Sequence, residues 1–167
     1  MTASNRSRLV EWTDPAAIFA AYRSGKYHTG LDLLQAMVDG EIPAPPIAAL
    51  LDYGPTSFEP GRAVFEHVPN ECTYNPLGVV HGGVAATLLD TVMACAIHTL
   101  LPIQTAYTTL ELKINYVRPI TVDTGRVEAI GQVLHQGKRT ALAEGKLVDS
   151  RGKLLAHGST TCLLLAD

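Results

Sequence analysis

The sequence predicts an α+β fold in which one curved antiparallel sheet of five or six strands wraps around a single long helix. Three observations predict it. An apolar stretch at 84–101 has the length of a helix, β-like runs lie on both sides of it, and prolines near residue 46 separate the first part of the chain. A chain of 167 residues fills one core but is short for two ordinary domains. We therefore expect a helical extension at 1–46 and one domain at 47–167.

The extension carries start signals for two short helices. Asp14 suits an N-cap and Pro15 suits a first helical turn, which predicts a helix that continues to Tyr22. A second helix is predicted over 30–38, because a glycine stands shortly after it. Three prolines at 43–46 then indicate a stiff linker into the main domain.

Two β-like runs precede the long helix. They cover residues 47–58 and 62–68, and the turn sequence Glu-Pro-Gly at 59–61 separates them. A loop with proline and glycine at 70–83 then leads into the helix.

The apolar stretch at 84–101 is better explained as a buried helix than as a membrane span. It is interrupted by polar residues that include Asp90 and His98. A bilayer span needs about 20 mostly apolar residues and rarely tolerates a central carboxylate. A helix that is apolar on nearly all sides has to be enclosed by protein.

The residues after the helix show the pattern of an antiparallel sheet. Residues 110–116 alternate strictly between apolar and polar side chains, and further runs follow at 126–134, 140–148 and 154–165. Their spacing is typical of consecutive hairpins. Such a sheet encloses the helix by curling around it, and its free face or edge favours pairing with a second copy of the chain.

The composition excludes several function classes. A formal net charge of −3 argues against nucleic-acid binding, which needs a basic face. The three cysteines form no C-x-x-C pair and the six histidines form no H-x-x-x-H pair, so we expect no metal site and no disulfide framework. The first twelve residues hold no apolar stretch of signal-peptide length. We therefore expect a cytoplasmic protein that does not bind membranes.

Gly82 and Gly83 stand where the loop becomes the helix. Glycine at such a place lets another molecule approach the backbone closely. The unpaired N–H groups of a helix start carry a partial positive charge, which suits a developing oxyanion.

Asp90 follows Gly82 by eight residues, slightly more than two helical turns, which puts both on nearly the same side of the helix. It is the only residue between His81 and His98 that is charged at neutral pH. A lone carboxylate is costly to bury unless it is paired or faces a cavity. Spacing alone therefore leaves two interpretations open: a functional carboxylate, or one that caps an internal group or pairs with a lysine. Taken alone, His81 is a packing residue and Asn75 a turn residue.

Together, the residues N-x-x-G-x-x-H-G-G-x-x-x-x-x-x-D at 75–90 resemble the signature of hot-dog-fold thioesterases. The resemblance is strongest to the phenylacetate-pathway (PaaI-type) branch of the 4-hydroxybenzoyl-CoA thioesterase superfamily. It runs over 47–165 and includes T-L-E-L-K-I-N-Y-V-R-P at 109–119 and the final strands with their turns at 137–139 and 149–152. It implies a hot-dog fold and hydrolysis of an acyl-CoA, with no cofactor beyond the coenzyme A moiety of the substrate. The apolar helix positions near Asp90 would leave room for an aromatic or medium- to long-chain acyl group.

The resemblance also implies a role for each motif residue. The Gly82 N–H would bind the thioester carbonyl oxygen, and Asn75 and His81 would shape that pocket or orient the attacking water. Asp90 would act as general base on water, or as nucleophile through an anhydride. Thr109 would help to hold the water. In this family the site is assembled across a dimer interface, so a homodimer or a dimer of dimers is expected.

The phosphates of coenzyme A require a basic rim. Arg118, Lys138 and Arg139 are the candidates, with Gly83 as a further substrate-binding position. Exposed basic residues at sheet edges also serve solubility, and this alternative stays open.

Two rival functions remain. A hot-dog dehydratase or hydratase would act on a β-hydroxyacyl thioester, and a non-catalytic module would bind acyl-CoA without turnover. Asp90 argues against the second, because a pure binder needs no carboxylate near the carbonyl. The extension at 1–46 would cover the sheet, lengthen the acyl tunnel or mediate assembly.

Overall fold

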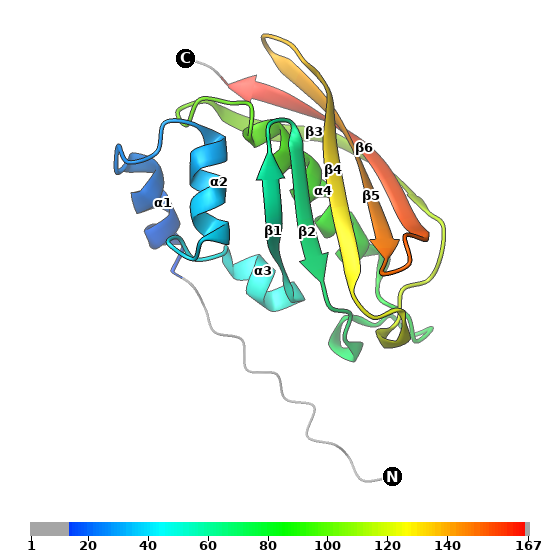
Figure 1. Cartoon of the computed structure of the whole chain (residues 1–167). Helices are drawn as coiled ribbons and strands as arrows, with labels where there is room; N and C mark the ends of the chain where they lie inside the picture. Colours follow the sequence, from blue (N-terminus) through cyan, green and yellow to red (C-terminus); the bar gives the residue numbers. More distant parts are fainter. Residues whose placement is uncertain (1–13, 166–167) are drawn as a thin grey trace.

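The computed structural model describes residues 14–165, which form a six-stranded antiparallel sheet curved around one long helix (Figure 1). The strand order is β1-β2-β4-β5-β6-β3. The bounds are β1 Tyr53–Glu59, β2 Arg62–His67, β3 Ala106–Tyr116, β4 Val127–Gln136, β5 Thr140–Asp149 and β6 Leu154–Leu165, with α4 Gly82–His98 as the central helix. The predicted α+β architecture is confirmed.

Both helices predicted in the extension are present. The first, α1 (Pro15–Arg23), begins where Asp14 accepts a hydrogen bond from the Ala16 N–H at 2.9 Å. The second, α2 (Gly30–Val38), begins with a capping box in which Thr29 and Asp32 satisfy each other's backbone N–H groups. The bounds of α2 agree with the prediction, whereas this capping box was not predicted.

The strand predicted over 47–58 is wrong in its first part. Pro46–Leu51 is a third helix, α3, and the strand begins only at Tyr53. Pro45 and Pro46 fix backbone angles that suit a helix start, and the alanines and leucines that follow are strong helix formers. The helix ends at Asp52, which adopts a left-handed conformation with φ of 59°. The helical part of the chain therefore continues to Leu51.

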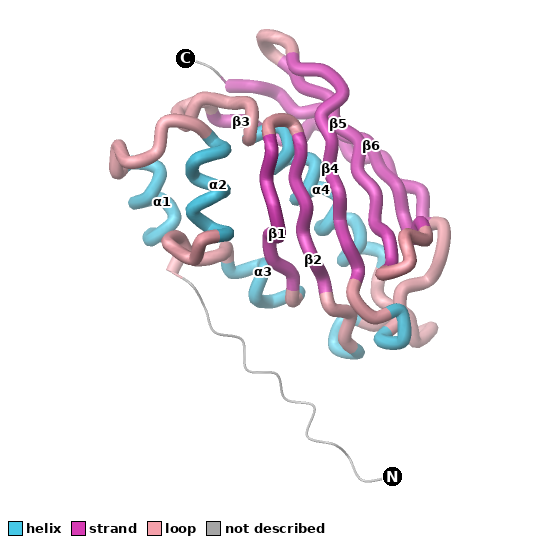
Figure 2. Tube along the Cα trace, in the orientation of Figure 1, coloured by secondary structure: helices cyan, strands magenta, loops and turns pink. Residues whose placement is uncertain are grey.

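The sheet has two unlike edges. The α2 and α3 helices lie beside β1 at one edge (Figure 2). At the other edge β3 pairs with β6, and no strand of the described residues pairs with its outer side. Consecutive β4, β5 and β6 form the predicted hairpins.

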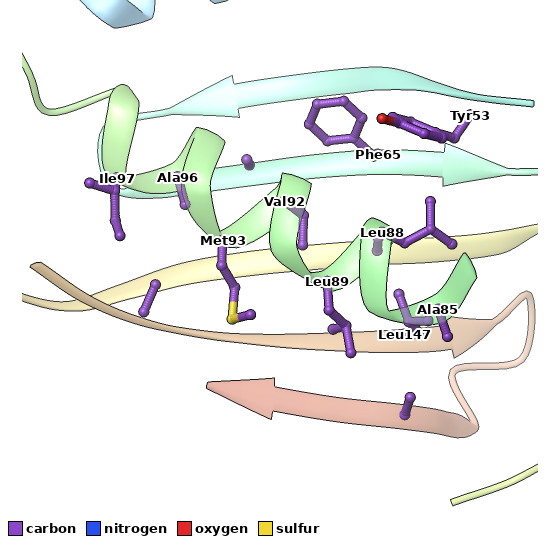
Figure 3. Packing of buried hydrophobic residues seen from close by; sticks show 14 of the residues in the cluster. Tyr53, Phe65, Ala85, Leu88, Leu89, Val92, Met93, Ala96, Ile97 and Leu147 are labelled. Atoms are coloured by element: carbon purple, nitrogen blue, oxygen red, sulfur yellow. The ribbon is translucent and has the colours of Figure 1, made fainter. Parts of the chain in front are cut away.

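The concave face of the sheet is filled by α4. Figure 3 shows its apolar side chains against the strands. Those fully buried include Leu88, Leu89, Val92, Met93, Ala96 and Ile97. None of the helices in residues 14–165 has the length and apolar character needed to cross a bilayer.

A row of three glycines lets α4 approach the sheet. Gly131, Gly145 and Gly158 are paired with one another in register across β4, β5 and β6. A Cβ atom on Gly131 would lie 2.4 Å from the carbonyl oxygen of Val92, and one on Gly145 would lie 2.9 Å from Cγ of Met93. The α4 helix can therefore lie this close to the sheet only because this glycine row carries no side chains.

We expect Gly131→Ala to lower the free energy of unfolding by about 1–3 kcal/mol, the usual cost of overpacking a filled core. The added methyl group meets helix backbone, which cannot yield as a flexible side chain can. Gly54→Ala is the control, because its Cβ would meet no atom within 4 Å; its effect should stay within about 0.5 kcal/mol. Urea unfolding measures both, and equal midpoints for the two variants would contradict the expectation.

Candidate active site

The loop before α4, from Asn75 to Gly82, is held by the Asn75 side chain. Its Oδ1 accepts hydrogen bonds from the backbone N–H groups of Leu77 at 2.9 Å and Val79 at 3.4 Å. The Asn75 N–H donates to the Val79 carbonyl at 2.8 Å, and Gly78 turns the chain with φ of 76°. The Nδ2 group of Asn75 has no hydrogen-bond acceptor within residues 14–165. It stays available as a donor.

His81 is the N-cap of α4. Its Nδ1 accepts a hydrogen bond from the Gly83 N–H at 2.8 Å, so the ring proton resides on Nε2. The N–H of Gly82 has no acceptor in the part of the chain that the structure describes. Of the two glycines at the helix start, only Gly82 therefore offers a free N–H to a ligand.

Tyr116 packs against Gly82 and was missed by sequence analysis. Its hydroxyl donates to the Gly82 carbonyl at 3.1 Å, and a Cβ atom on Gly82 would lie 3.2 Å from the ring. The side chain is 58% exposed. The alternating pattern counted Tyr116 only as an apolar position, and its hydroxyl was the one signal of a polar role.

One open cavity of about 340 Å³ is lined by Asn75, Gly82, Tyr116 and Arg118. The guanidinium of Arg118 is tethered through Nη1, which donates to the Leu154 carbonyl. Most of the remaining lining is apolar. The cavity thus joins backbone and amide donors to a basic residue at the start of α4.

Asp90 lies further along α4 and is bonded to β3. The Thr109 hydroxyl donates to Asp90 Oδ1 at 2.9 Å, and both residues are partly buried. Within residues 14–165 no Lys, Arg or His lies within ion-pair distance of this carboxylate. The alternative in which a lysine neutralises Asp90 therefore has no support in the structure.

In one chain, the Asp90–Thr109 pair and the Asn75–Gly82 loop do not form a single site. Gly82 and Asp90 are separated by eight residues, which is about 12 Å along the helix axis. A general base and an oxyanion donor each have to act within about 3 Å of the same reacting groups. The two groups, which we call half-sites, both lie on the side of α4 that faces β3.

The basic candidates also divide between the two half-sites. Lys138 and Arg139 are exposed in the β4–β5 hairpin, and Thr109 lies at the same end of the sheet, because its partner Cys162 pairs with the start of β5. Arg118 lies at the opposite end, beside the start of β6. The ten residues of β5 span about 33 Å. Arg118 is therefore far from the other two in one chain.

The described residues contain no cluster of three or more His, Cys, Asp or Glu side chains that could hold a metal ion. The chemistry that the half-sites can perform is hydrogen-bond donation to an oxygen anion at Gly82 and Asn75, and proton acceptance at Asp90.

Comparison with known proteins identifies the family. The sequence model of the thioesterase superfamily matches residues 77–156. The 1,4-dihydroxy-2-naphthoyl-CoA hydrolase of Listeria monocytogenes is 32% identical over 105 residues, which are 63% of this chain and 84% of that protein. The chain belongs to the thioesterase superfamily. It is thus a thioester hydrolase, as the sequence predicted.

Solved structures agree with this family and with the hot-dog fold. A conserved protein of Pseudomonas aeruginosa is 32% identical, with a TM-score of 0.67 over 71% of this chain and 93% of its own. A phenylacetic acid degradation-related protein from Ralstonia eutropha is 26% identical, with a TM-score of 0.71 over 78% of this chain and 98% of its own. The E. coli PaaI protein shares the fold, at 23% identity and a TM-score of 0.70 over 80% and 94%. The predicted resemblance to PaaI-type hot-dog thioesterases is confirmed.

We expect His81→Ala to destabilise this thioesterase by about 1 kcal/mol, because the helix start loses the acceptor for the Gly83 N–H. His81→Asn should retain most of the stability, since asparagine is a favoured N-cap. The measurement is the free energy of unfolding in urea. Equal stability of the two variants would exclude the capping role.

Proposed function

We propose that the protein hydrolyses acyl-CoA thioesters to free acid and CoA at sites that two subunits share. The observation that carries the proposal is the free Gly82 N–H at one end of α4 and the Asp90–Thr109 pair about 12 Å further along the same helix. Two complementary half-sites on one helix are what a two-fold symmetric dimer needs to build two complete sites. The CoA hydrolase of Listeria supports coenzyme A as the leaving group.

The unpaired edge at β3 supports such a dimer. An exposed strand edge is a template for a strand of another chain, and Leu110 on β3 is 56% exposed. If β3 pairs with its own copy antiparallel about a two-fold axis, the Tyr116 end of one strand lies beside the Thr109 end of the other. The Asn75–Gly82 loop of one subunit then approaches the Asp90–Thr109 pair of the partner subunit. A dimer of dimers remains compatible with this pairing.

In the proposed reaction the thioester carbonyl oxygen binds the Gly82 N–H and the Asn75 amide. Asp90, oriented by Thr109, accepts a proton from water as the water oxygen bonds to the carbonyl carbon. The resulting oxyanion is stabilised by the two donors, and collapse breaks the C–S bond and releases CoA as thiolate, to which the proton is returned. A nucleophilic Asp90 that forms an anhydride is the alternative route. A positioned base contributes about 10²–10⁴-fold and an oxyanion donor about 3–4 kcal/mol.

The same dimer would bring the basic candidates together. Arg118 accompanies the Gly82 half-site, whereas Lys138 and Arg139 lie at the Thr109 end of the sheet. Antiparallel pairing of β3 would place Arg118 of one subunit on the side of the partner's β4–β5 hairpin. This arrangement supports these residues as binders of the coenzyme phosphates.

A cytoplasmic location is part of the proposal, supported by Cys95 and Cys162, neither of which is in a disulfide.

We expect Asp90→Asn to lower kcat/KM by at least about 10²-fold, because the amide cannot accept the proton of water. Thiol release from a panel of acyl-CoAs measures this. Asp39→Asn is the control, because Asp39 is exposed at the end of α2, beside the sheet edge opposite β3. A folded Asp90→Asn variant as active as wild type would refute the proposal. Tight acyl-CoA binding without thiol release would favour a binding module instead, and release of an enoyl product would favour a hydratase.

Subunit mixing tests whether the site is shared. Asn75→Ala and Asp90→Asn each damage a different half-site, so a hybrid dimer contains one site with both defects and one intact site. Unfolding and refolding the two inactive variants together should restore about a quarter of wild-type activity, because half of the dimers are hybrids with one good site each. If mixing restores nothing although hybrids form, each chain works alone.

A further inference from the structure

A second cavity, of about 220 Å³, lies between the N-terminal helices and the core. Its walls come from α1, α2 and α3 on one side and from β1, β2, β3 and α4 on the other. It is more enclosed and more apolar than the cavity at Gly82. The extension therefore does more than cover the sheet, because it completes an internal pocket.

Residues next to the Asp90–Thr109 pair on α4 and β3 line the pocket. Thr91, the residue after Asp90, lines it, and His98 lines it two turns further along α4. Tyr107 lines it from β3 and points to the same face of the strand as Thr109, two residues later. Burial is the main cause that raises the pKa of Tyr107, and neighbouring groups, with Asp90 as the smallest contribution, add to it. One end of the pocket thus adjoins the carboxylate.

The outer wall at the other end is α1. Ile18 and Tyr22 line the pocket, and the Tyr22 ring stacks on the His98 ring with centroids 5.9 Å apart and an interplanar angle of 7°. The His98 ring in turn contacts Tyr107, at 5.2 Å between centroids. Tyr22 therefore closes the pocket at the point where the extension meets the core.

The lining carries no charge at neutral pH. None of the described residues that line it is Asp, Glu, Lys or Arg. Burial lowers the pKa of His98 to about 4, and burial, assisted by neighbouring thiol or carboxylate groups, raises the pKa of Tyr22 and Cys95 to about 12. A charged ligand group would have no partner there, whereas an uncharged apolar group would be buried favourably.

We propose that this pocket receives the acyl group of the substrate and that Tyr22 and Ile18 of α1 limit its length. The inference rests on the proposed function, since the pocket leads away from the Asp90–Thr109 pair. An apolar cavity of about 150 Å³ is enough for benzene, so 220 Å³ fits an uncharged acyl group of roughly six to eight carbon atoms. The extension thereby makes the enzyme selective against longer chains.

The test is the acyl-chain-length profile of kcat/KM, from acetyl-CoA to tetradecanoyl-CoA, by thiol release. Wild type should be most active at about six to eight carbons. Tyr22→Ala removes the end wall and should raise kcat/KM for tetradecanoyl-CoA relative to hexanoyl-CoA by about tenfold or more. Ala44→Phe, which fills the pocket from the linker before α3, should move the optimum toward acetyl-CoA.

Phe19→Ala is the matched control, because Phe19 lies on α1 between the two wall residues but is 62% exposed and outside the pocket. Its profile should equal that of wild type, and thermal unfolding confirms that each variant folds. If wild type hydrolyses the panel and both Tyr22→Ala and Ala44→Phe keep its profile, the pocket inference is overturned while the proposed function stands. If wild type releases thiol from no member, the proposed function fails and this inference fails with it.

Discussion

The close contact between α4 and the sheet at the glycine row is the constraint on which the rest of the structure depends. Gly131, Gly145 and Gly158 form a shallow trough across three neighbouring strands, and the middle turns of α4 rest in it. A helix lifted by one methyl group would carry Asp90 away from Thr109, because the 2.9 Å hydrogen bond between them spans helix and strand. The same trough therefore sets the core packing and the geometry of the candidate site.

The helix that fills the core also carries both groups to which the proposed reaction assigns a chemical role. In its first turn the Gly83 N–H is bonded to His81, whereas the Gly82 N–H has no acceptor among residues 14–165. Its third turn carries the carboxylate. Both groups are held by an element that is buried along most of its length, so little conformational freedom has to be lost when a substrate binds. In the proposed dimer each α4 helix contributes to two active sites, to one through its first turn and to the other through its third turn.

Turn residues, capping residues and hydrophobic periodicity made several helix and strand boundaries predictable from the sequence. The bounds of β6 and of α2 followed from turn residues and periodicity, and the start of α1 followed from Asp14 and Pro15. The α3 helix was mistaken for strand, because a short apolar run has no periodicity that separates the two, and the paired prolines were interpreted as linker. The pairing of β3 with β6 was not predictable either, because it joins segments about 50 residues apart in the sequence.

The candidate site, too, was predictable where it depends on local sequence and not where it depends on tertiary structure. The motif predicted which backbone N–H and which carboxylate to examine, but Tyr116 and the opposite positions of Arg118 and Lys138 depend on tertiary structure. Spacing along a helix gives the relative direction of two side chains and their separation along the axis, but not the strand that they face. Gly82 and Asp90 do face the same strand, yet their separation along the axis means that one chain presents halves rather than a whole.

The unlike edges of the sheet have a consequence for aggregation. Strands that bond on both sides can polymerise without limit, as in fibres. Here α2 and α3 occupy the space beside β1, so edge-to-edge growth through β3 would end with the proposed dimer. By covering the β1 edge, the N-terminal helices thus prevent the exposed β3 edge from leading to a filament of many copies.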